Sequence, residues 1–219
     1  TFPERVVQWN NLTLAAHARL AESTLLTAIG NFSTAVTASA LGLGASATLP
    51  SQILAAAAGM RSRHRMDENA VLRVMLPNWV KDLLVSDVYR TQFQRFDMTA
   101  DDFIRILRAG NVEPSFYIDG AAGAAQVFGT QTAGVLLPFP ATVVWYLFPE
   151  GSFLYLDGGT LELGIVRDSV LNETNDYQIF GESFEAVAYV GVDAIKVTTT
   201  VCDNGTVSLP NDVNCPIVY

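Results

Sequence analysis

The chain has 219 residues, of which 50% are hydrophobic and 16% charged, and its formal net charge is -9. This composition supplies enough apolar surface for one large core or two modest ones and argues against disorder. The acidic balance argues against a dedicated nucleic-acid-binding protein, because such proteins usually carry a basic face.

The charge is distributed unevenly along the chain. Residues 1–108 hold eleven Lys and Arg against nine Asp and Glu, whereas residues 109–219 hold only Arg167 and Lys196 against thirteen acidic residues. The C-terminal half should therefore repel polyanions. Two interpretations stay open, a surface that keeps a polyanion at a distance and a charge that only maintains solubility.

A long helix is predicted at residues 3–30. Thr1 and Glu4, with Pro3 between them, have the pattern of a capping box, and Gly30 followed by Asn31 is a typical end signal. Small and apolar residues recur at spacings of three and four, which predicts one buried stripe. The stripe consists of Leu14, Ala18, Ala21, Leu25 and Ala28.

The next region combines a connector with a second helix. Residues 33–50 are rich in Ser, Thr, Ala and Gly and are interpreted as irregular, and the helix is expected to start at Ser51, after Pro50. It ends in the basic run Arg61–Arg65. Basic side chains in a last turn stabilise a helix C-terminus, which is the favoured interpretation of this run, and a DNA-facing or intersubunit role is the alternative.

Two further helices and a strand are predicted before residue 111. Residues 71–76 form a short buried strand, and Pro77 opens a third helix. Thr99 and Asp102 cap a fourth helix, which stops at Gly110.

The rest of the chain contains only strand-like runs, at residues 112–118, 126–129, 135–147 and 153–156. Helices and strands are largely segregated and no regular βαβ repeat occurs, so α+β is the predicted class.

Two strands are predicted near the C-terminus. Residues 184–190 are apolar on both faces, so this strand should lie deep. Residues 195–201 alternate, with Ile195, Val197 and Val201 on one side, which predicts a sheet with one wet face. We expect the helix at residues 3–30 to pack against the sheet that contains those three side chains. Asn204-Gly205 predicts a hairpin turn followed by a short strand at residues 206–209.

Residues with catalytic or metal-binding potential are sparse. His17 and His64 belong to no ligand cluster, and His17 is interpreted as a helix-surface residue. Asp157-Gly158-Gly159 is best explained as a tight turn. A hydrolase built on Asp157, Glu162 and Asp168 is the weakest alternative, because no nucleophile accompanies these carboxylates. We expect no catalytic, cofactor-binding or metal site, no cofactor, and no enzyme activity.

The low cysteine content is typical of a protein in a reducing compartment. Cys202 and Cys215 are too few for a disulfide scaffold, and we expect both to be reduced in the cell. The most apolar window, residues 134–149, is too short for a membrane span and contains two prolines. Asn-x-Ser/Thr tripeptides start at Asn11, Asn31, Asn172 and Asn204. Together with the two cysteines they keep a secreted β-rich binding module open as a different class.

Several ordered segments resemble one known family. They are TFPERVVQWNNLTLAAHARL, VMLPNWVKDLL, LYLDGG, LELGIVRDS, the turn at residues 174–176 and ESFEAVA. Together they resemble major capsid proteins of tailed bacteriophages with the Hong Kong 97-like fold, most closely those of phages that infect actinobacteria. The resemblance implies an α+β fold with a peripheral domain, residues 1–67 and 161–202, whose spine helix is 3–30. It also implies an axial domain at residues 68–160 and a C-terminal hairpin and tail at 203–219.

The resemblance implies a structural subunit of an icosahedral virion. Many copies would assemble into hexamers and pentamers in the bacterial cytoplasm, with scaffold, protease and portal proteins as further partners, around DNA that is not bound sequence-specifically. No membrane is involved. An encapsulin-like nanocompartment subunit is the alternative within the fold. Lys81 and Lys196 do not match the cross-linking lysine of some members. No N-terminal arm or extended loop is recognisable, so we expect the 219-residue chain to be a monomer or small oligomer in dilute solution.

Overall fold

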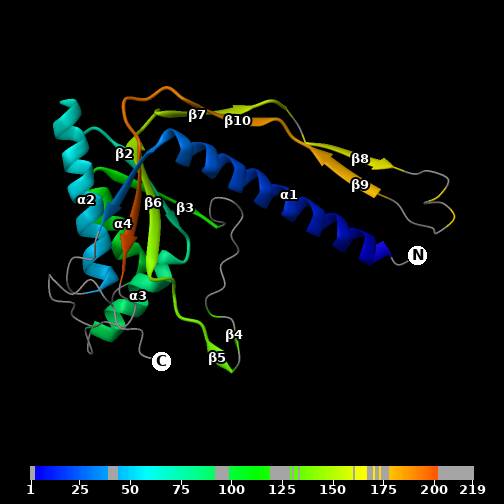
Figure 1. The fold of residues 1–219 in the computed structure, drawn as a ribbon, viewed down its shortest axis with the longest axis horizontal. Helices are drawn as coiled ribbons and strands as arrows, with labels where there is room; N and C mark the ends of the chain where they lie inside the picture. Colours follow the sequence, from blue (N-terminus) through cyan, green and yellow to red (C-terminus); the bar gives the residue numbers. More distant parts are fainter. Residues whose placement is uncertain are drawn as a thin grey trace.

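The computed structural model describes residues 3–38, 44–91, 99–118, 129, 131–132, 134–159, 161–166, 170, 173 and 178–201. These residues form two parts (Figure 1). We call the five-stranded sheet with its covering helices α2, α3 and α4 the body. We call the long helix α1 with the two-stranded ribbons beside it the extension.

The helices are α1 (Pro3–Phe32), α2 (Ala45–His64), α3 (Val80–Thr91) and α4 (Ala100–Ala109). The first six strands are β1 (Thr34–Ala38), β2 (Leu72–Pro77), β3 (Val112–Tyr117), β4 (Gln131–Thr132), β5 (Val135–Leu136) and β6 (Thr142–Pro149). The remaining strands are β7 (Phe153–Asp157), β8 (Glu162–Val166), β9 (Gln178–Glu182), β10 (Glu185–Tyr189) and β11 (Ile195–Thr200).

The body sheet has the strand order β1-β11-β6-β2-β3. β1 pairs with β11 and β2 with β3 in parallel, while β6 lies antiparallel to both β11 and β2. The last strand of the described chain is therefore an interior strand. The predicted alternation is confirmed there, because Ile195, Val197 and Thr199 are buried and the residues between them are half-buried.

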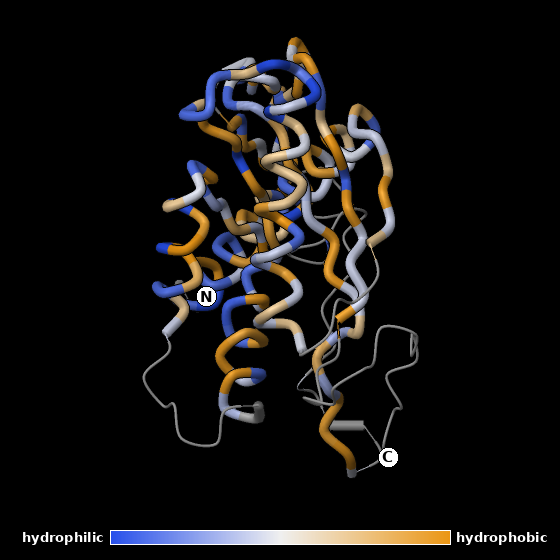
Figure 2. The backbone as a smooth tube through the Cα atoms, turned by 90° about the vertical axis from the view of Figure 1, so that its left-hand side faces the viewer, coloured by the Kyte–Doolittle hydropathy of each residue, from blue (hydrophilic) through white to orange (hydrophobic). Residues whose placement is uncertain are grey.

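The main core lies between this sheet and helices α2, α3 and α4. Trp145 on β6 is its largest fully buried side chain, and Phe103 and Leu107 of α4 pack into the same cluster. In Figure 2 hydrophobic and hydrophilic stretches alternate along the helices, as expected when each helix buries one face. A polar relay runs through this core. The Trp145 indole donates to the Thr199 hydroxyl at 2.9 Å, which donates to Gln52 Oε1 at 2.8 Å.

Removing this hydroxyl should destabilise the body. We expect Thr199→Val to lower the free energy of unfolding by about 2 kcal/mol, because the buried indole N–H of Trp145 loses its acceptor in a site closed to water. Urea unfolding followed by tryptophan fluorescence measures the change. Thr199→Ser keeps the hydroxyl and should lose less than half as much. A valine variant as stable as the parent would contradict the role given to the relay.

The opposite face of the sheet receives the end of α1. Leu26 and Ile29 are buried against Tyr146, Phe148 and Ala194. The predicted helix at residues 3–30 is thus confirmed, with its end at Phe32, and it does pack on the sheet that contains β11.

The side chains of Ile195, Val197 and Val201 themselves do not face this helix. Those side chains point to the α2 side and belong to the main core. Alternate residues of a strand face opposite sides of the sheet, and the side that α1 covers gains its apolar character from Tyr146 and Phe148 of β6. The pattern of β11 alone could not reveal that contribution.

Two expectations around the second helix are wrong. Residues 34–38 were expected in an irregular connector and form β1, and α2 begins at Ala45 with Pro50 inside it, not at Ser51. The reason lies on α3. The buried carboxylate of Asp87 accepts a hydrogen bond from the Ser46 N–H at 2.8 Å and so caps the helix start from a distance in sequence.

The remaining body elements follow the sequence more closely. Strand β2 and the fourth helix are confirmed, while the third helix begins at Val80, after two turn residues that follow Pro77. At the start of α4 the Thr99 N–H and hydroxyl both donate to Asp102 Oδ2, at 2.9 and 3.0 Å. Its far end is tied to β3 by an ion pair between Arg108 and Glu113 at 2.6 Å.

These two carboxylates are expected to contribute to the acid sensitivity of the body. The hydrogen bonds from Thr99 lower the pKa of Asp102, and the hydrogen bond from Arg108 lowers the pKa of Glu113. A depressed folded-state pKa contributes stability that is present above the unfolded pKa, near 4, and is lost as the pH falls through the folded value. We therefore expect the urea concentration at the unfolding midpoint to decrease as the pH is lowered from about 5 to about 3. Asp102→Asn should flatten that decline, and an unchanged slope would contradict it.

The extension is long and thin. Helix α1 has 30 residues and so measures about 45 Å. Beside it β7 pairs with β10, and β8 pairs with β9, both antiparallel. Because β7 leads directly toward β8 and β9 toward β10, the two pairs follow one another along α1 (Figure 1).

The strand expected at residues 184–190 is present as β10, but its predicted depth is wrong. Its five residues are exposed or half-buried. The strand belongs to a two-stranded ribbon, so α1 covers one face and leaves the other open. The prediction of a deep strand assumed that both apolar faces are buried within this subunit.

Candidate interaction surface

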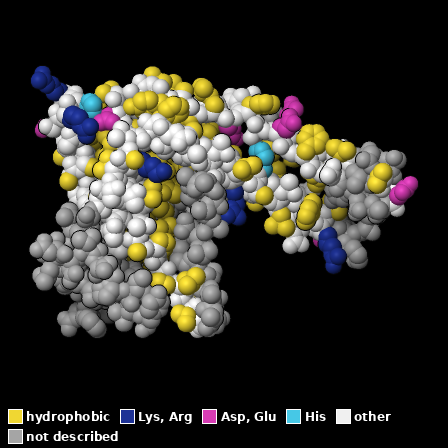
Figure 3. Space-filling model, in the orientation of Figure 1, with side chains coloured by type: hydrophobic (Ala, Val, Ile, Leu, Met, Phe, Trp, Pro, Cys, Tyr) yellow, Lys and Arg dark blue, Asp and Glu magenta, His cyan; other side chains and the backbone are white. Residues whose placement is uncertain are grey.

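The extension carries an unusual number of exposed apolar side chains. Along α1 they include Val7, Trp9, Leu12 and Leu20, which are 57 to 68% exposed. On and beside the ribbons Leu163, Ile165 and Phe184 are 56 to 67% exposed. Figure 3 shows hydrophobic side chains at several places on the visible face of the extension. Scattered exposed apolar residues are normal, whereas a concentration on one part marks a contact surface.

The architecture of the extension explains this exposure. A two-stranded ribbon is marginally stable by itself and has two faces and two outer edges. Helix α1 packs on one face, with β10 as its main contact. Within the described part of the chain, no further strand pairs with either ribbon. The ribbons of the extension thus have one face covered by α1 and one face that is open to a contact with another molecule.

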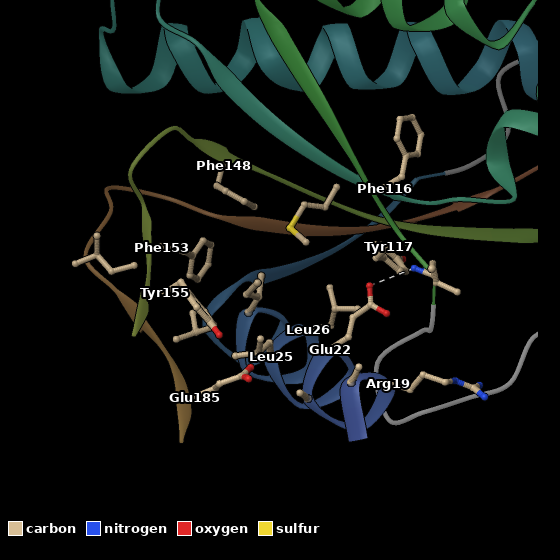
Figure 4. A pocket seen from close by; sticks show the side chains of 17 residues that line it. Arg19, Glu22, Leu25, Leu26, Phe116, Tyr117, Phe148, Phe153, Tyr155 and Glu185 are labelled. Carbon is tan, nitrogen blue, oxygen red and sulfur yellow. Dashed lines mark hydrogen bonds between the residues drawn. The ribbon is translucent and has the colours of Figure 1, made fainter. Parts of the chain in front are cut away.

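An apolar groove of about 800 Å³ lies where the extension meets the body (Figure 4). Leu25 and Leu26 of α1 form one wall, and Phe148 and Phe153 form another. One polar contact lies at an end of the groove, where the backbone N–H of Ile118 donates to Glu22 Oε1 at 3.3 Å. The aromatic floor includes Tyr117, whose hydroxyl donates to the Val144 carbonyl at 2.8 Å and whose pKa is raised by burial.

His17 lies at a contact between α1 and the ribbon. Its Nε2 is 3.3 Å from Ser183 Oγ, beside a hollow of about 180 Å³. A catalytic serine needs a base that is itself oriented by a third group. No such partner of the ring is recorded among the described residues, so we interpret the pair as a helix-to-ribbon hydrogen bond. The expected helix-surface position of His17 is thus modified, since the ring is half-buried.

The basic run at the end of α2 is used inside the molecule. Arg61 donates to the backbone carbonyls of Ala70, Gly110 and Asn111 at 2.9 to 3.1 Å. Asp193, in the turn before β11, accepts from His64 Nε2 at 2.9 Å and pairs with Arg63 at 3.2 Å. The run therefore ties three chain segments together, a role that neither the helix-dipole interpretation nor a DNA-facing one had included.

The other residues singled out by the sequence have ordinary surroundings. Asp157 Oδ1 accepts from the Gly159 N–H at 3.1 Å, as a turn residue does. Lys81 lies over the Phe116 ring at 3.8 Å. Glu162 begins β8, at some distance along the ribbon from Asp157, and forms no recorded hydrogen bond or ion pair among the described residues.

Several expectations lie outside the described residues. They are the pair Cys202 and Cys215, the hairpin at 204–205 with its strand at 206–209, Asp168, the turn at 174–176 and all but Gly129 of the strand at 126–129. Across the described ranges, no three His, Cys, Asp or Glu side chains converge as metal ligands would. Over the same ranges, no helix combines the length and the hydrophobicity of a membrane span.

No family model and no curated protein matches this chain. Solved structures do match its shape. One is described as the capsid structure of the cyanophage P-SCSP1u, with 9% identity, a TM-score of 0.47, and coverage of 91% of this chain and 66% of that one. Another is described as the asymmetric unit of the bacteriophage PhiM1 mature capsid, with 13% identity, a TM-score of 0.50, and coverage of 91% and 65%. The second likeness carries the assignment. The chain has an α+β phage capsid fold.

This capsid fold confirms the predicted class and gives the extension a context. The chain spans about two thirds of the length of the two capsid chains it matches. Sequence reasoning missed the interaction surface, although one signal was available. Strands β8 and β9 carry Gly164 and Gly181, and a glycine inside a strand has no side chain to pack in an interior.

Proposed function

We propose that the protein is a structural subunit of the icosahedral capsid of a tailed bacteriophage, with the Hong Kong 97-like form of the fold. Copies would assemble into hexamers and pentamers that enclose double-stranded DNA. The observation that carries this proposal is the extension, whose exposed apolar helix face and unpartnered ribbon require cover from other molecules. A shell of repeated subunits supplies that cover from every side.

The likeness to the PhiM1 capsid structure supports the proposal at the level of the fold. The sequence resemblance to capsid proteins of actinobacteria-infecting phages points to the same type of molecule. The acidic C-terminal half fits a wall that does not bind the packaged genome. The same proposal includes residence in the virion and assembly in the host cytoplasm. It also includes the absence of catalysis and of catalytic or ligand sites, and partnership with scaffold, protease and portal proteins.

The division into peripheral and axial domains is also part of the proposal, and the packing supports a boundary that differs from the sequence-based one. Helix α2 and strands β1 and β11 were assigned to the peripheral domain, at residues 1–67 and 161–202. They share the main core with β2, β6, α3 and α4 of the expected axial domain, 68–160. We therefore propose that the body corresponds to the axial domain and the extension to the peripheral domain.

Purified particles test this function. The protein should sediment with phage particles as an abundant polypeptide, present in many copies, and negative-stain microscopy should show closed shells that protect double-stranded DNA from nuclease. Shells that hold protein cargo and no DNA would favour an encapsulin-like compartment. Secreted protein with glycans or a disulfide, found by mass spectrometry and outside any particle, would overturn the proposal in favour of a binding module.

A further inference from the structure

The two edges of the body sheet differ in what they present to solvent. At one edge the Thr34 N–H donates to the Ala194 carbonyl at 2.8 Å, so the even-numbered residues of β1 direct their backbone groups toward β11. The N–H and C=O groups of Ala35 and Thr37 consequently point outward. Among the described residues, no hydrogen bond to these four groups is recorded. In Figure 1 β1 is the blue strand that follows α1.

The opposite edge is protected. The Leu72 N–H donates to the Asn111 carbonyl, and the Asn78 N–H donates to the Tyr117 carbonyl, so the odd-numbered residues of β3 face β2. Pro114 is then one of the outward residues, and proline has no N–H to offer. Natural sheets block free edges with proline or charge. The β1 sequence, TAVTA, contains neither.

An apolar hollow lies beside the β1 edge. It measures about 290 Å³ and is lined by Val36, Ala55, Ala56, Trp145 and Ile195. Val36 is 41% exposed. On the α2 side the hollow is lined by Gln52, which is buried and accepts a hydrogen bond from Thr199, and by Ala55 and Ala56, which have only methyl side chains. A strand added to β1 could place an apolar side chain over this hollow.

We propose that β1 pairs in antiparallel fashion with β1 of a second copy of this chain, about a two-fold axis at Val36. In an antiparallel ladder a hydrogen-bonded pair exchanges both bonds. Opposing Ala35 to Thr37 of the other copy, and Thr37 to its Ala35, uses all four outward groups of each strand in four hydrogen bonds. Val36 then faces its own counterpart in a non-hydrogen-bonded pair, where side chains approach most closely, and each valine extends the cover of the adjacent hollows.

Strand β1 of a second copy fits this edge better than strand β3 of a second copy. Pairing of β1 with β3 of a neighbour would leave one of the outward groups unmet at Pro114. The β1–β1 register is symmetric, as an isologous contact requires, and places no charge opposite a like charge although each chain carries a net charge of -9. Five-residue strands bury well under the roughly 1,200 Å² of a stable interface, so this contact forms at high local concentration. The inference does not depend on the proposed function.

Cysteine cross-linking tests the register at single-residue resolution. In a background with Cys202→Ser and Cys215→Ser, Val36→Cys should form a disulfide-linked homodimer under mild oxidation. Ala35→Cys and Thr37→Cys should each stay monomeric, because neither meets itself across the axis. A mixture of those two proteins should give the heterodimer. We expect the Val36→Cys yield to exceed that of either single control by at least about tenfold, the ratio of a 1.4 kcal/mol preference.

A blocking variant separates pairing from random collision. Thr37→Pro, added to Val36→Cys, removes an outward N–H from the edge of β1, as Pro114 does at the edge of β3, and should suppress the cross-link. Thr37→Glu tests the same pairing by placing a charge on the edge. Circular dichroism checks that each variant is folded. Equal cross-linking by all three cysteine positions, or no response to both blocking variants, would overturn the proposal. A Val36→Cys adduct with a different protein in place of the homodimer would also overturn it.

Discussion

Replacing Gly44 with alanine is expected to lower the free energy of unfolding by about 3 kcal/mol. Gly44 precedes α2 with φ of 92° and ψ of 179°, a region that essentially only glycine adopts. A Cβ atom there would also lie 2.5 Å from Asp87 Oδ1 and 2.6 Å from Oδ2. The new methyl group would displace the buried carboxylate that caps α2, so backbone strain and the loss of a buried hydrogen bond act together.

Two other glycines serve as controls for this substitution. Gly151 also has a positive φ, of 85°, but a Cβ there meets nothing within 4 Å, so Gly151→Ala should show the backbone strain alone. Gly59 lies within α2 with open space around it, and Gly59→Ala should stabilise that helix by up to about 1 kcal/mol. Chemical denaturation of the three variants measures these differences. A Gly44→Ala loss no larger than that of Gly151→Ala would show that Asp87 has no part in it.

Charging the extension should abolish particle formation while leaving the subunit folded. Leu20 of α1 and Phe184, between β9 and β10, are 68% and 67% exposed. The double variant Leu20→Asp and Phe184→Asp should change subunit stability by less than about 1 kcal/mol, because neither side chain is buried. If neighbouring subunits cover these side chains, each copy must bury two unpaired charges, and the yield of particles should fall by at least about tenfold.

Sedimentation and negative-stain microscopy of phage particles that carry the variant measure that yield, because the 219-residue chain alone is expected to stay a monomer or small oligomer. The matched control is Leu20→Met with Phe184→Leu, which keeps apolar side chains of similar size and should assemble normally. Circular dichroism and urea unfolding establish that both variants are folded. Normal assembly of the aspartate variant would show that these two positions face solvent in the particle and that the contact surface lies elsewhere.

Local signals predicted the elements whose structure depends on neighbours in sequence. The box formed by Thr99 and Asp102 fixes the start of α4, and the alternation of Ile195 and Val197 identifies β11, because both patterns report contacts within a few residues. Where the sequence-based prediction failed, a distant residue decides. Asp87 sets the start of α2, and β11 recruits the weakly patterned residues 34–38 as its parallel neighbour.

The contact surface was harder to predict for a related reason. Strands apolar on both faces usually lie inside a protein, and β10 has that pattern while lying on a ribbon with one open face. The sequence specifies that these faces are to be buried but does not distinguish burial within the chain from burial between chains. The extension of α1 away from the body resolves the ambiguity, because it leaves no other part of the described chain within reach (Figure 1).

The position of β11 has a consequence for synthesis. This strand lies between β1 and β6, yet its residues are 195–200, more than 150 positions after β1. While the chain emerges from the ribosome, β1 has no neighbour and one edge of β6 stays unpaired. Contacts of such long sequence separation form slowly, and unpaired edges invite aggregation. The body should therefore become protease-resistant only after residue 201 has left the exit tunnel, and chains halted before β11 should depend on chaperones to remain available for folding.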